Sequence, residues 1–521
     1  DERLRAKRHH EKPDFIKLIR AWGGITIVYR RTMQESPAYT HNHEELQKAF
    51  EEGIYYREAL EPAEVILNAH GECETLVCHR RQKNPAGEWE STQDAIRLPA
   101  RSIFVATGTQ PNIAYEFEHR GTFNRVGVHY QHYENQNDEL IVAHGIKHCK
   151  EPDFGPFTSY QKNDHRVSLI GDTHPVFHGN VVKAIASGMR TYPKILESLH
   201  QKLGQRGDEK EYQQFSEKMT KYFSATVKKI ERLSKNIIEL TIEAPLASKH
   251  FKPGHFYRLQ NYETIAPRVK DTILQMEPLA LVASDCDRET GILKFIVIEK
   301  GVSSSLCALL KVGEPVSLMG PTGIRAKISN EQETVLVIID EMGLPFLHAY
   351  GTALREKGNH VICLALFNHP ELIKQAADII IPSTAERGID DLISHAGITL
   401  ADVDRIYLIT DTPFLKKFQA ARATELKTHF VKDPVVHASV YSTMQCMLKG
   451  VCAQCLQWQM DPETGKRTKA VFACSWPLQP LEVIDLDNID ERQSQNRLQE
   501  TLNQMWLDFL RTTENMLQLK Q

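Results

Sequence analysis

The chain has 521 residues, of which 41% are hydrophobic and 25% charged, an ordinary globular composition for a protein of about three or four domains. Its 63 Lys and Arg against 67 Asp and Glu give a net charge of −4, which excludes the strongly basic surface typical of nucleic-acid binding. Apolar runs are far shorter than the ~20 residues of a membrane span, and the first residues are charged, unlike a secretory signal, so we expect a cytoplasmic, multidomain α/β protein with no membrane span.

Residues 1–100 have the pattern of a partial NAD(P)-binding domain. The apolar run 25–29 predicts a strand, and segments near 65–67, 74–77 and 95–98 predict an antiparallel extension. Arg30 and Arg31 stand where the first strand ends. In a dinucleotide-binding unit an acidic residue at that place binds the ribose 2′-hydroxyl, whereas arginine neutralises a 2′-phosphate, so the pair favours NADP(H) over NAD(H). A solvated strand end is the alternative, because no glycine-rich phosphate loop precedes residue 25.

Residues 101–200 are predicted to form the C-terminal part of an FAD-binding domain. Two expected strands, 103–106 and 167–170, each run into a glycine-containing turn, and a helix is expected from residue 181. The carboxylate after the second strand would accept a hydrogen bond from the flavin's ribityl chain, and the helix start would stabilise charge at the pyrimidine edge. An ordinary capped helix is the alternative. The residues of this candidate site are Thr107, Gly108, Thr109, Gly171, Asp172, Gly179, Val181 and Val182.

A charged segment over 201–221 is predicted to be a linker, and the chain changes character after it. Short alternating strands punctuated by Gly and Pro over 222–330 predict a small antiparallel β-barrel. In it, Gly301, Ser303 and Ser304 form a turn that would cradle a pyrophosphate, an N-capped helix being the alternative. Residues 331–445 predict a second α/β nucleotide-binding-like domain. Leu498, Leu502, Met505 and Phe509 give the C-terminal helix, 488–521, one apolar face, expected to pack on its own domain or to bind a partner.

Residues 446–487 hold the strongest motif. Cys446, Cys452, Cys455 and Cys474 have the spacing C-x5-C-x2-C-x18-C. The plant-type [2Fe–2S] spacing is C-x4-C-x2-C…C, so the first gap is one residue longer here. Structural zinc more often shows two C-x2-C pairs, and free buried thiols are a further alternative. The spacing therefore favours a [2Fe–2S] cluster held by these four cysteines.

Two resemblances follow from these motifs. Residues 1–200 resemble the C-terminal half of the glutamate synthase small-subunit-like flavoproteins, in the stretches 27–31, 106–112 and 171–185. Residues 222–485 resemble the ferredoxin-reductase-like electron-transfer subunit of dihydroorotate dehydrogenase, in 251–256 and 301–306. Together they imply a fused oxidoreductase with a flavin barrel, a nicotinamide domain and a [2Fe–2S] loop. The phosphate loops of the first family would lie before residue 1, so we expect the chain to be the C-terminal portion of a longer polypeptide.

The second module departs from its family at three places. Residues 277–280 lack the arginine that faces the flavin pyrophosphate, and 410–413 lack the expected cysteine. In 339–345 a single glycine remains, and Asp340 and Glu341 stand where a pyrophosphate would approach, so Coulomb repulsion opposes dinucleotide binding. These departures predict that the module acts as a scaffold that presents the cluster.

The combined interpretation is a flavin-dependent NAD(P)H oxidoreductase. Electrons would pass from NAD(P)H through FAD to the [2Fe–2S] cluster and then to a redox partner protein or catalytic subunit, because a flavin converts a two-electron donor into one-electron steps. The alternative is a non-catalytic electron-wiring or docking subunit of a larger oxidoreductase, or a zinc-stabilised binding module. No general acid or base is assigned.

Overall fold

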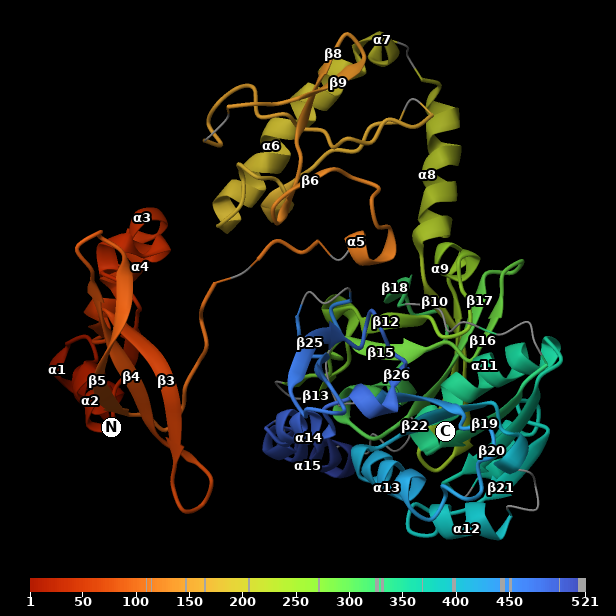
Figure 1. The fold of residues 1–521 in the computed structure, drawn as a ribbon. Helices are drawn as coiled ribbons and strands as arrows, with labels where there is room; N and C mark the ends of the chain where they lie inside the picture. The colour runs from red at the N-terminus through yellow and green to blue at the C-terminus, as the bar shows by residue number, and fades with distance from the viewer. Residues whose placement is uncertain are drawn as a thin grey trace.

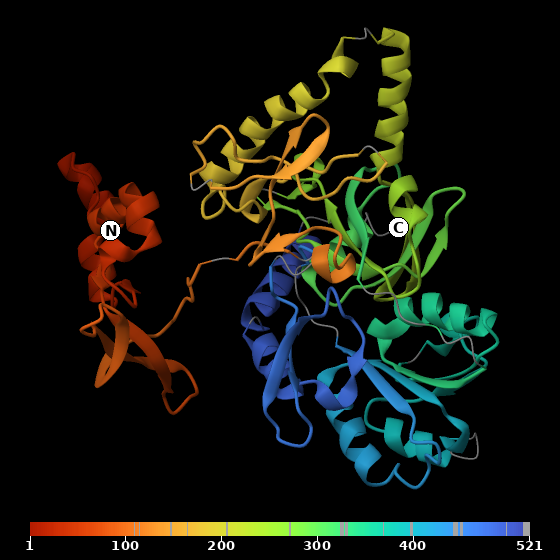
Figure 2. The ribbon, with the colours of Figure 1, turned by 45° about the horizontal axis from the view of Figure 1, so that its top comes forward.

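The computed structural model describes residues 1–513 apart from 109, 114, 146–147, 164, 205–206, 270–271, 324–327, 329–331, 368, 396–399, 441–445, 449–451 and 496. Its described residues form an N-terminal lobe (1–100), a middle lobe (101–223) and a larger C-terminal body (224–513), and the N-terminal lobe stands apart from the rest in both views (Figure 1, Figure 2). None of the helices in these ranges is both long and apolar enough to cross a bilayer.

The N-terminal lobe contains a parallel strand pair and an antiparallel meander. The predicted first strand is present as β1, which pairs with β2, and the predicted extension is present as the sheet β3-β4-β5. Gly53 turns the chain from α4 into β2 with φ +82°, and a Cβ there would meet the Ile16 side chain at 2.6 Å, so only glycine fits. The elements are α1 (Glu2–His9), α2 (Ile16–Ala21), β1 (Thr26–Val28), η1 (Met33–Glu35), α3 (Pro37–His41), α4 (His43–Glu51), β2 (Tyr55–Arg57), β3 (Leu60–Leu67), β4 (Cys73–Lys83) and β5 (Trp89–Pro99).

The middle lobe differs from the sequence prediction. Its two expected strands are wrong: residues 103–106 are exposed coil, with Phe104 89% exposed, and residues 167–170 contribute only an isolated bridge at Ser168. A strand needs a neighbour for its backbone hydrogen bonds, and none of the described strands runs beside 103–106. The expected linker contains helix α8, capped by Asp208. The elements are α5 (Tyr115–Glu118), β6 (Arg125–Val126), β7 (His129–Tyr130), β8 (Tyr133–Gln136), β9 (Glu139–Val142), η2 (Gly171–Thr173), α6 (Val181–Ser198), α7 (His200–Leu203) and α8 (Glu209–Phe223).

Two antiparallel sheets replace the predicted barrel. Strands β10-β11-β17-β16 form one sheet and β15-β12-β18 the other, and an isolated bridge from Thr226 to Pro315 joins them, so the described residues form no closed barrel. The chain bends between β15 and β16 and passes from one sheet to the other, and both sheets bury side chains such as Tyr257 and Phe295 in a shared core. The elements are β10 (Thr226–Ser234), β11 (Ile237–Glu243), α9 (Pro245–Lys249), β12 (Phe256–Asn261), η3 (Glu263–Ile265), β13 (Arg268–Val269), β14 (Thr272–Ile273), β15 (Leu279–Val282), β16 (Asp285–Asp287), β17 (Ile292–Ile298), α10 (Val302–Leu306), η4 (Cys307–Leu309) and β18 (Val316–Thr322).

Residues 334–440 form most of a second α/β unit. Its strands have the order β21-β20-β19-β22-β23-β26, parallel except for the short antiparallel β26. Both faces of the sheet are covered, which explains why β19 is a continuous apolar run rather than an alternating one. The elements are β19 (Thr334–Ile339), η5 (Glu341–Gly343), α11 (Leu344–Glu356), β20 (His360–Ala365), η6 (Pro370–Ile373), β21 (Ile379–Pro382), α12 (Gly388–Ser394), η7 (Leu400–Asp402), β22 (Arg405–Thr410), α13 (Thr412–Ala423) and β23 (Val435–Val440).

The C-terminal segment returns to both halves of the body. The hairpin β24–β25 meets the parallel sheet through three buried glutamines, with Gln479 hydrogen-bonded to Gln457 and Gln459 at 2.6 and 2.9 Å. Helix α15 buries Leu507 and Leu510 in the core of the antiparallel sheets, whereas the predicted apolar face, which includes Leu498, is exposed. The elements are β24 (Leu456–Met460), β25 (Arg467–Phe472), β26 (Gln479–Pro480), η8 (Leu481–Val483), α14 (Leu486–Ser494) and α15 (Arg497–Thr513).

Candidate functional site

The β24–β25 hairpin brings distant cysteines together. Cys455 directly precedes β24 and Cys474 follows β25, and the pairing of Leu456 with Phe472 places the two cysteines at the base of the same hairpin. The Ala473 N–H donates to the Cys455 carbonyl at 3.0 Å, which extends that base by one hydrogen bond. Eighteen intervening residues in the sequence are therefore closed into one local unit.

Cys446 packs against the two cysteines of the hairpin base. It is buried in one apolar cluster with Cys474, Leu448 and Phe256, and Cys455 packs against the same cluster. The Cys446 N–H donates to the Pro278 carbonyl at 3.0 Å, which ties the loop to the antiparallel sheets just before β15. The loop thus spans the hairpin and the antiparallel sheets.

Backbone N–H groups point at two of the sulfurs. The Leu448 N–H donates to Cys446 Sγ and the Cys474 N–H to Cys455 Sγ, each at 3.4 Å. Leu448 and Ala453 have φ of 63° and 55°, the left-handed conformation that turns successive amides inward. Donors of this kind favour a thiolate over a thiol, which is the form that metal ligation needs.

The thiols differ in acidity. A hydrogen bond with Cys474 lowers the pKa of Cys455 to about 6, against the effect of burial. Burial raises the pKa of Cys446, and the Leu448 N–H and the Arg258 guanidinium partly offset that rise, while Cys455 and Cys452 add to it. Over the described residues, however, no three His, Cys, Asp or Glu groups converge closely enough to hold a metal ion. The loop thus brings Cys446, Cys455 and Cys474 into one apolar cluster, in which the pKa of Cys455 is lowered and that of Cys446 is raised.

The candidate flavin residues form a turn before helix α6. The Asp172 carboxylate accepts a hydrogen bond from the Gly179 N–H at 3.1 Å, and the Gly171 N–H donates to Ser187 Oγ at 2.7 Å. Val181 and Val182 open the helix and are each 70% exposed. The other three candidates lie apart from this turn in the sequence, Thr107 and Gly108 in exposed coil and Thr109 outside the described residues.

Sequence reasoning missed a histidine pair beside this turn. The rings of His129 and His178 lie 4.7 Å apart, and burial and the His178 ring lower the pKa of His129, while Asp172 raises it. His129 Nε2 is buried and has no hydrogen-bond partner among the described residues, so a group bound beside Asp172 would satisfy it. The signal available in the sequence was His178, which lies in the loop between Asp172 and Gly179.

Helix α15 covers the predicted pyrophosphate turn. The Ser304 hydroxyl is bonded within the turn to Gly301, and Ser303 Oγ accepts from the Glu277 N–H at 2.9 Å. A Cβ at Gly301 would lie 3.9 Å from the Glu500 carboxylate of α15. Arg511 of the same helix donates to the carbonyl of α10 residue 305 at 3.1 Å. An anionic pyrophosphate at this turn would therefore meet a carboxylate.

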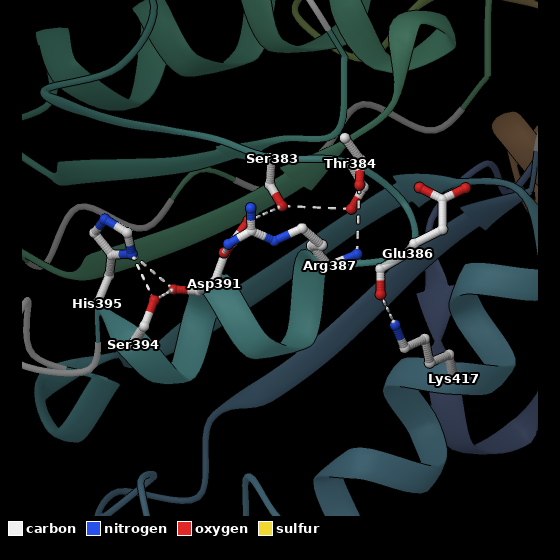
Figure 3. Close-up of polar contacts among 8 residues, drawn as sticks. All are labelled: Ser383, Thr384, Glu386, Arg387, Asp391, Ser394, His395 and Lys417. Carbon is white, nitrogen blue, oxygen red and sulfur yellow. Dashed lines mark hydrogen bonds and ion pairs between the residues drawn. The ribbon is translucent and has the colours of Figure 1, made fainter.

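At the carboxyl edge of the parallel sheet, the loops after β19 and β21 are held by hydrogen bonds to the carboxylates of Asp340 and Asp391. Asp340 caps the turn after β19 by accepting from the Met342 N–H at 2.8 Å, and burial raises the pKa of its carboxyl. A Cβ on Gly343 would meet Ile339 at 2.7 Å, so this glycine serves packing. After β21, Ser383 and Arg387 both bond the Asp391 carboxylate, at 2.7 and 2.8 Å (Figure 3).

Arg30 and Arg31 follow β1 on the N-terminal lobe after the single residue Tyr29, and both are exposed. The Ala59 N–H donates to the Arg31 carbonyl at 3.1 Å, which holds this segment beside the end of β2. The arginines, the Asp172 turn and the cysteine loop thus lie in three different parts of the molecule (Figure 1). The structure does not bring the predicted site residues into one site.

The comparisons with known proteins reach most of the chain. No protein-family model matches it. The Rickettsia prowazekii protein RP006 is 29% identical over 488 residues, which cover 94% of this chain and 57% of that protein, so the chain spans a little more than half of its length. A solved NADH-dependent reduced ferredoxin-NADP oxidoreductase has a TM-score of 0.43 at 20% identity over 54% of this chain and 97% of its own. The electron-transfer subunit of dihydroorotate dehydrogenase B (NAD(+)) of Bacillus cereus is 23% identical over 254 residues, 46% of this chain and 90% of that subunit, and the chain is therefore weakly homologous to it.

Proposed function

We propose that the chain belongs to a flavin-dependent oxidoreductase that passes electrons from NAD(P)H through FAD to a [2Fe–2S] cluster and an acceptor protein. The observation that carries the proposal is the cysteine loop, in which Cys455 and Cys474 share a hairpin base and Cys446 packs against them. The weak homology to an electron-transfer subunit supports the same class of reaction.

The candidate residues for the [2Fe–2S] cluster and for FAD lie in different parts of the chain. Cys446, Cys452, Cys455 and Cys474 would hold the cluster, which supplies one-electron transfer when bound. The hydrogen bonds on Cys446 and Cys455 fit that assignment, because cluster thiolates accept backbone N–H groups. In the middle lobe, Asp172 and the unsatisfied His129 Nε2 offer an acceptor and an open ring nitrogen to FAD.

Other residues of the chain would tune this site. Phe256 and Leu448 pack on the cysteines and exclude water, which strengthens every charge interaction inside the cluster loop. The Arg258 guanidinium acts on Cys446 in the direction that favours negative charge. A group with thiolate ligands carries negative charge, so both effects favour its retention.

A specific observation favours the second candidate function, a non-catalytic electron-wiring subunit. In the C-terminal body the pyrophosphate turn at Gly301 lies under α15, and the loop after β19 is closed by Asp340. This body would then carry the cluster without binding a flavin or a dinucleotide of its own. The flavin content of the purified protein separates the two functions.

The test is anaerobic purification of the whole chain, followed by iron, sulfide, zinc and flavin analysis and a visible spectrum. We expect about two irons and two sulfides per chain. Cys452→Ser should remove both without changing the flavin content. Cys73→Ser is the matched control, because that thiol lies in the N-terminal lobe and donates to the Ala100 carbonyl as a serine would. One zinc and no visible absorption would refute the electron-transfer proposal.

A further inference from the structure

One arginine of helix α14 contacts the backbone of the cysteine loop. The Arg492 guanidinium donates to the carbonyls of Ala453 and Gln454, at 3.3 and 3.0 Å, and also to the Leu456 carbonyl. These three carbonyls flank Cys455 in the sequence. An arginine presents its N–H donors in a rigid planar fork, so a single side chain can hold several acceptors in one arrangement.

The helix that carries this arginine is anchored outside the loop. Helix α14 buries Leu486 and Ile489 in the core of the parallel sheet, and its Asp490 pairs with Lys416 of α13 at 2.5 Å. Arg492 therefore reaches the cysteine loop from a helix that is fixed on the α/β unit. It lies in a part of the chain that the resemblance to the electron-transfer subunit does not cover.

The contacts fix the direction of a peptide group beside a sulfur. In a trans peptide the C=O and the N–H point to opposite sides. The Gln454 carbonyl points at Arg492, so the Cys455 N–H of the same peptide group points away from the guanidinium. That N–H acts on the Cys455 sulfur together with the N–H groups of Ala473 and Cys474. Holding the carbonyl on the arginine thus keeps a hydrogen-bond donor, and not a carbonyl oxygen, on the side of the sulfur.

The contacts also hold a residue in an unusual backbone conformation. Ala453 has a φ of 55°, in the left-handed region that is unfavourable for residues with a Cβ. Its carbonyl accepts from the Leu456 N–H at 3.2 Å and from the Arg492 guanidinium at 3.3 Å. Cys452 precedes this turn and Cys455 lies within it, so holding the turn fixes how these two candidate ligands stand to each other.

We propose that Arg492 is a positioning residue of the cysteine loop, which keeps the carbonyls around Cys455 on its guanidinium and the Cys455 N–H on the sulfur. The inference rests on the proposed [2Fe–2S] function and adds to it a residue outside the four cysteines. Hydrogen bonds to ligand sulfurs favour the more negatively charged, reduced state, so this arrangement raises the reduction potential. The positive charge of the guanidinium acts in the same direction.

The first test is a reductive titration of the anaerobically purified whole chain with dithionite, followed by visible absorption. Arg492→Gln removes the fork and its charge, whereas Arg492→Lys keeps the charge on a compact ammonium group. Losing a donor at a ligand sulfur should shift the equilibrium between oxidised and reduced forms by about tenfold, which lowers the potential of both variants by about 59 mV. Arg497→Gln is the charge-matched control, because this exposed arginine of α15 makes none of the three carbonyl contacts, and its potential should be unchanged.

A second measurement needs no cluster. Hydrogen exchange, followed by mass spectrometry on the whole chain after iron has been removed with a chelator, reports the peptide that covers residues 452–457. We expect faster exchange in this peptide in both Arg492 variants and wild-type exchange in the Arg497 variant. Unchanged exchange in β19 and β22 shows that the variants are folded.

Two results would overturn the proposal. The first is a wild-type potential in Arg492→Gln, or in Arg492→Lys, since the latter shows that the charge acts without the fork. The second is wild-type exchange over residues 452–457 in both variants. A wild-type chain that holds zinc and no iron overturns the electron-transfer function instead, and the exchange measurement then still decides whether Arg492 positions the loop.

Discussion

Replacing Leu510 with alanine tests whether α15 holds the antiparallel sheets together. Leu510 is 1% exposed and lies in the core cluster of those sheets, so the change removes three buried carbon groups. At about 0.8 kcal/mol each, transfer alone costs about 2.4 kcal/mol, and the cavity left behind brings the loss to about 3 kcal/mol. That loss corresponds to a roughly 100-fold rise in the opening equilibrium of the packed elements.

Hydrogen exchange measured by mass spectrometry reports this opening peptide by peptide. We expect faster exchange in peptides that cover α10 and β17, with the parallel sheet unchanged. Met505→Ala is the matched control, since Met505 lies on the same helix but is 63% exposed, and it should change exchange by less than about 0.5 kcal/mol. Equal effects of the two substitutions, or no effect in α10, would refute the packing argument.

Three further predictions concern other parts of the fold. Gly351→Ala should destabilise the parallel sheet, because its Cβ would lie 2.3 Å from the Ala376 carbonyl, whereas Gly188→Ala, with nothing within 4 Å, should leave the melting temperature unchanged or raise it. Gln479→Leu leaves the buried side chains of Gln457 and Gln459 without their hydrogen-bond partner, so the free energy of unfolding measured in urea should fall by about 2–5 kcal/mol. A loss under about 1 kcal/mol would show that water replaces these hydrogen bonds. Burial lowers the pKa of His174 to about 4. Between about pH 6.5 and 4 the imidazole is therefore protonated in the unfolded chain but stays neutral in the folded one, so the middle lobe should lose stability as the pH falls from about 6.5 toward 4. His174→Gln should flatten that dependence in melting curves, and an unchanged slope would assign it to other groups.

The sequence predicted local structure well where one physical signal dominated. The buried apolar run of β19 lies in the segment that was predicted to be α/β, and side chains cover both faces of its sheet. The prediction of a strand at 103–106 was wrong, because an apolar run does not show whether a partner strand lies beside it. The C-terminal helix was predicted, but its apolar face was not the buried one, since packing, and not periodicity alone, selects the face.

The contact between Glu500 and the Gly301 turn could not be predicted from spacing. It depends on the docking of the last helix on a turn that lies far earlier in the sequence. Long-range packing decides such contacts, and no local pattern encodes them.

The cysteine loop connects two parts of the chain that are held by different contacts. Cys455 and Cys474 are brought together by the local pairing of β24 with β25. Cys446 is held by its hydrogen bond to the Pro278 carbonyl, next to the antiparallel sheets. A group bound to all of these sulfurs would therefore cross-link the hairpin to the antiparallel sheets, and its removal would weaken that connection.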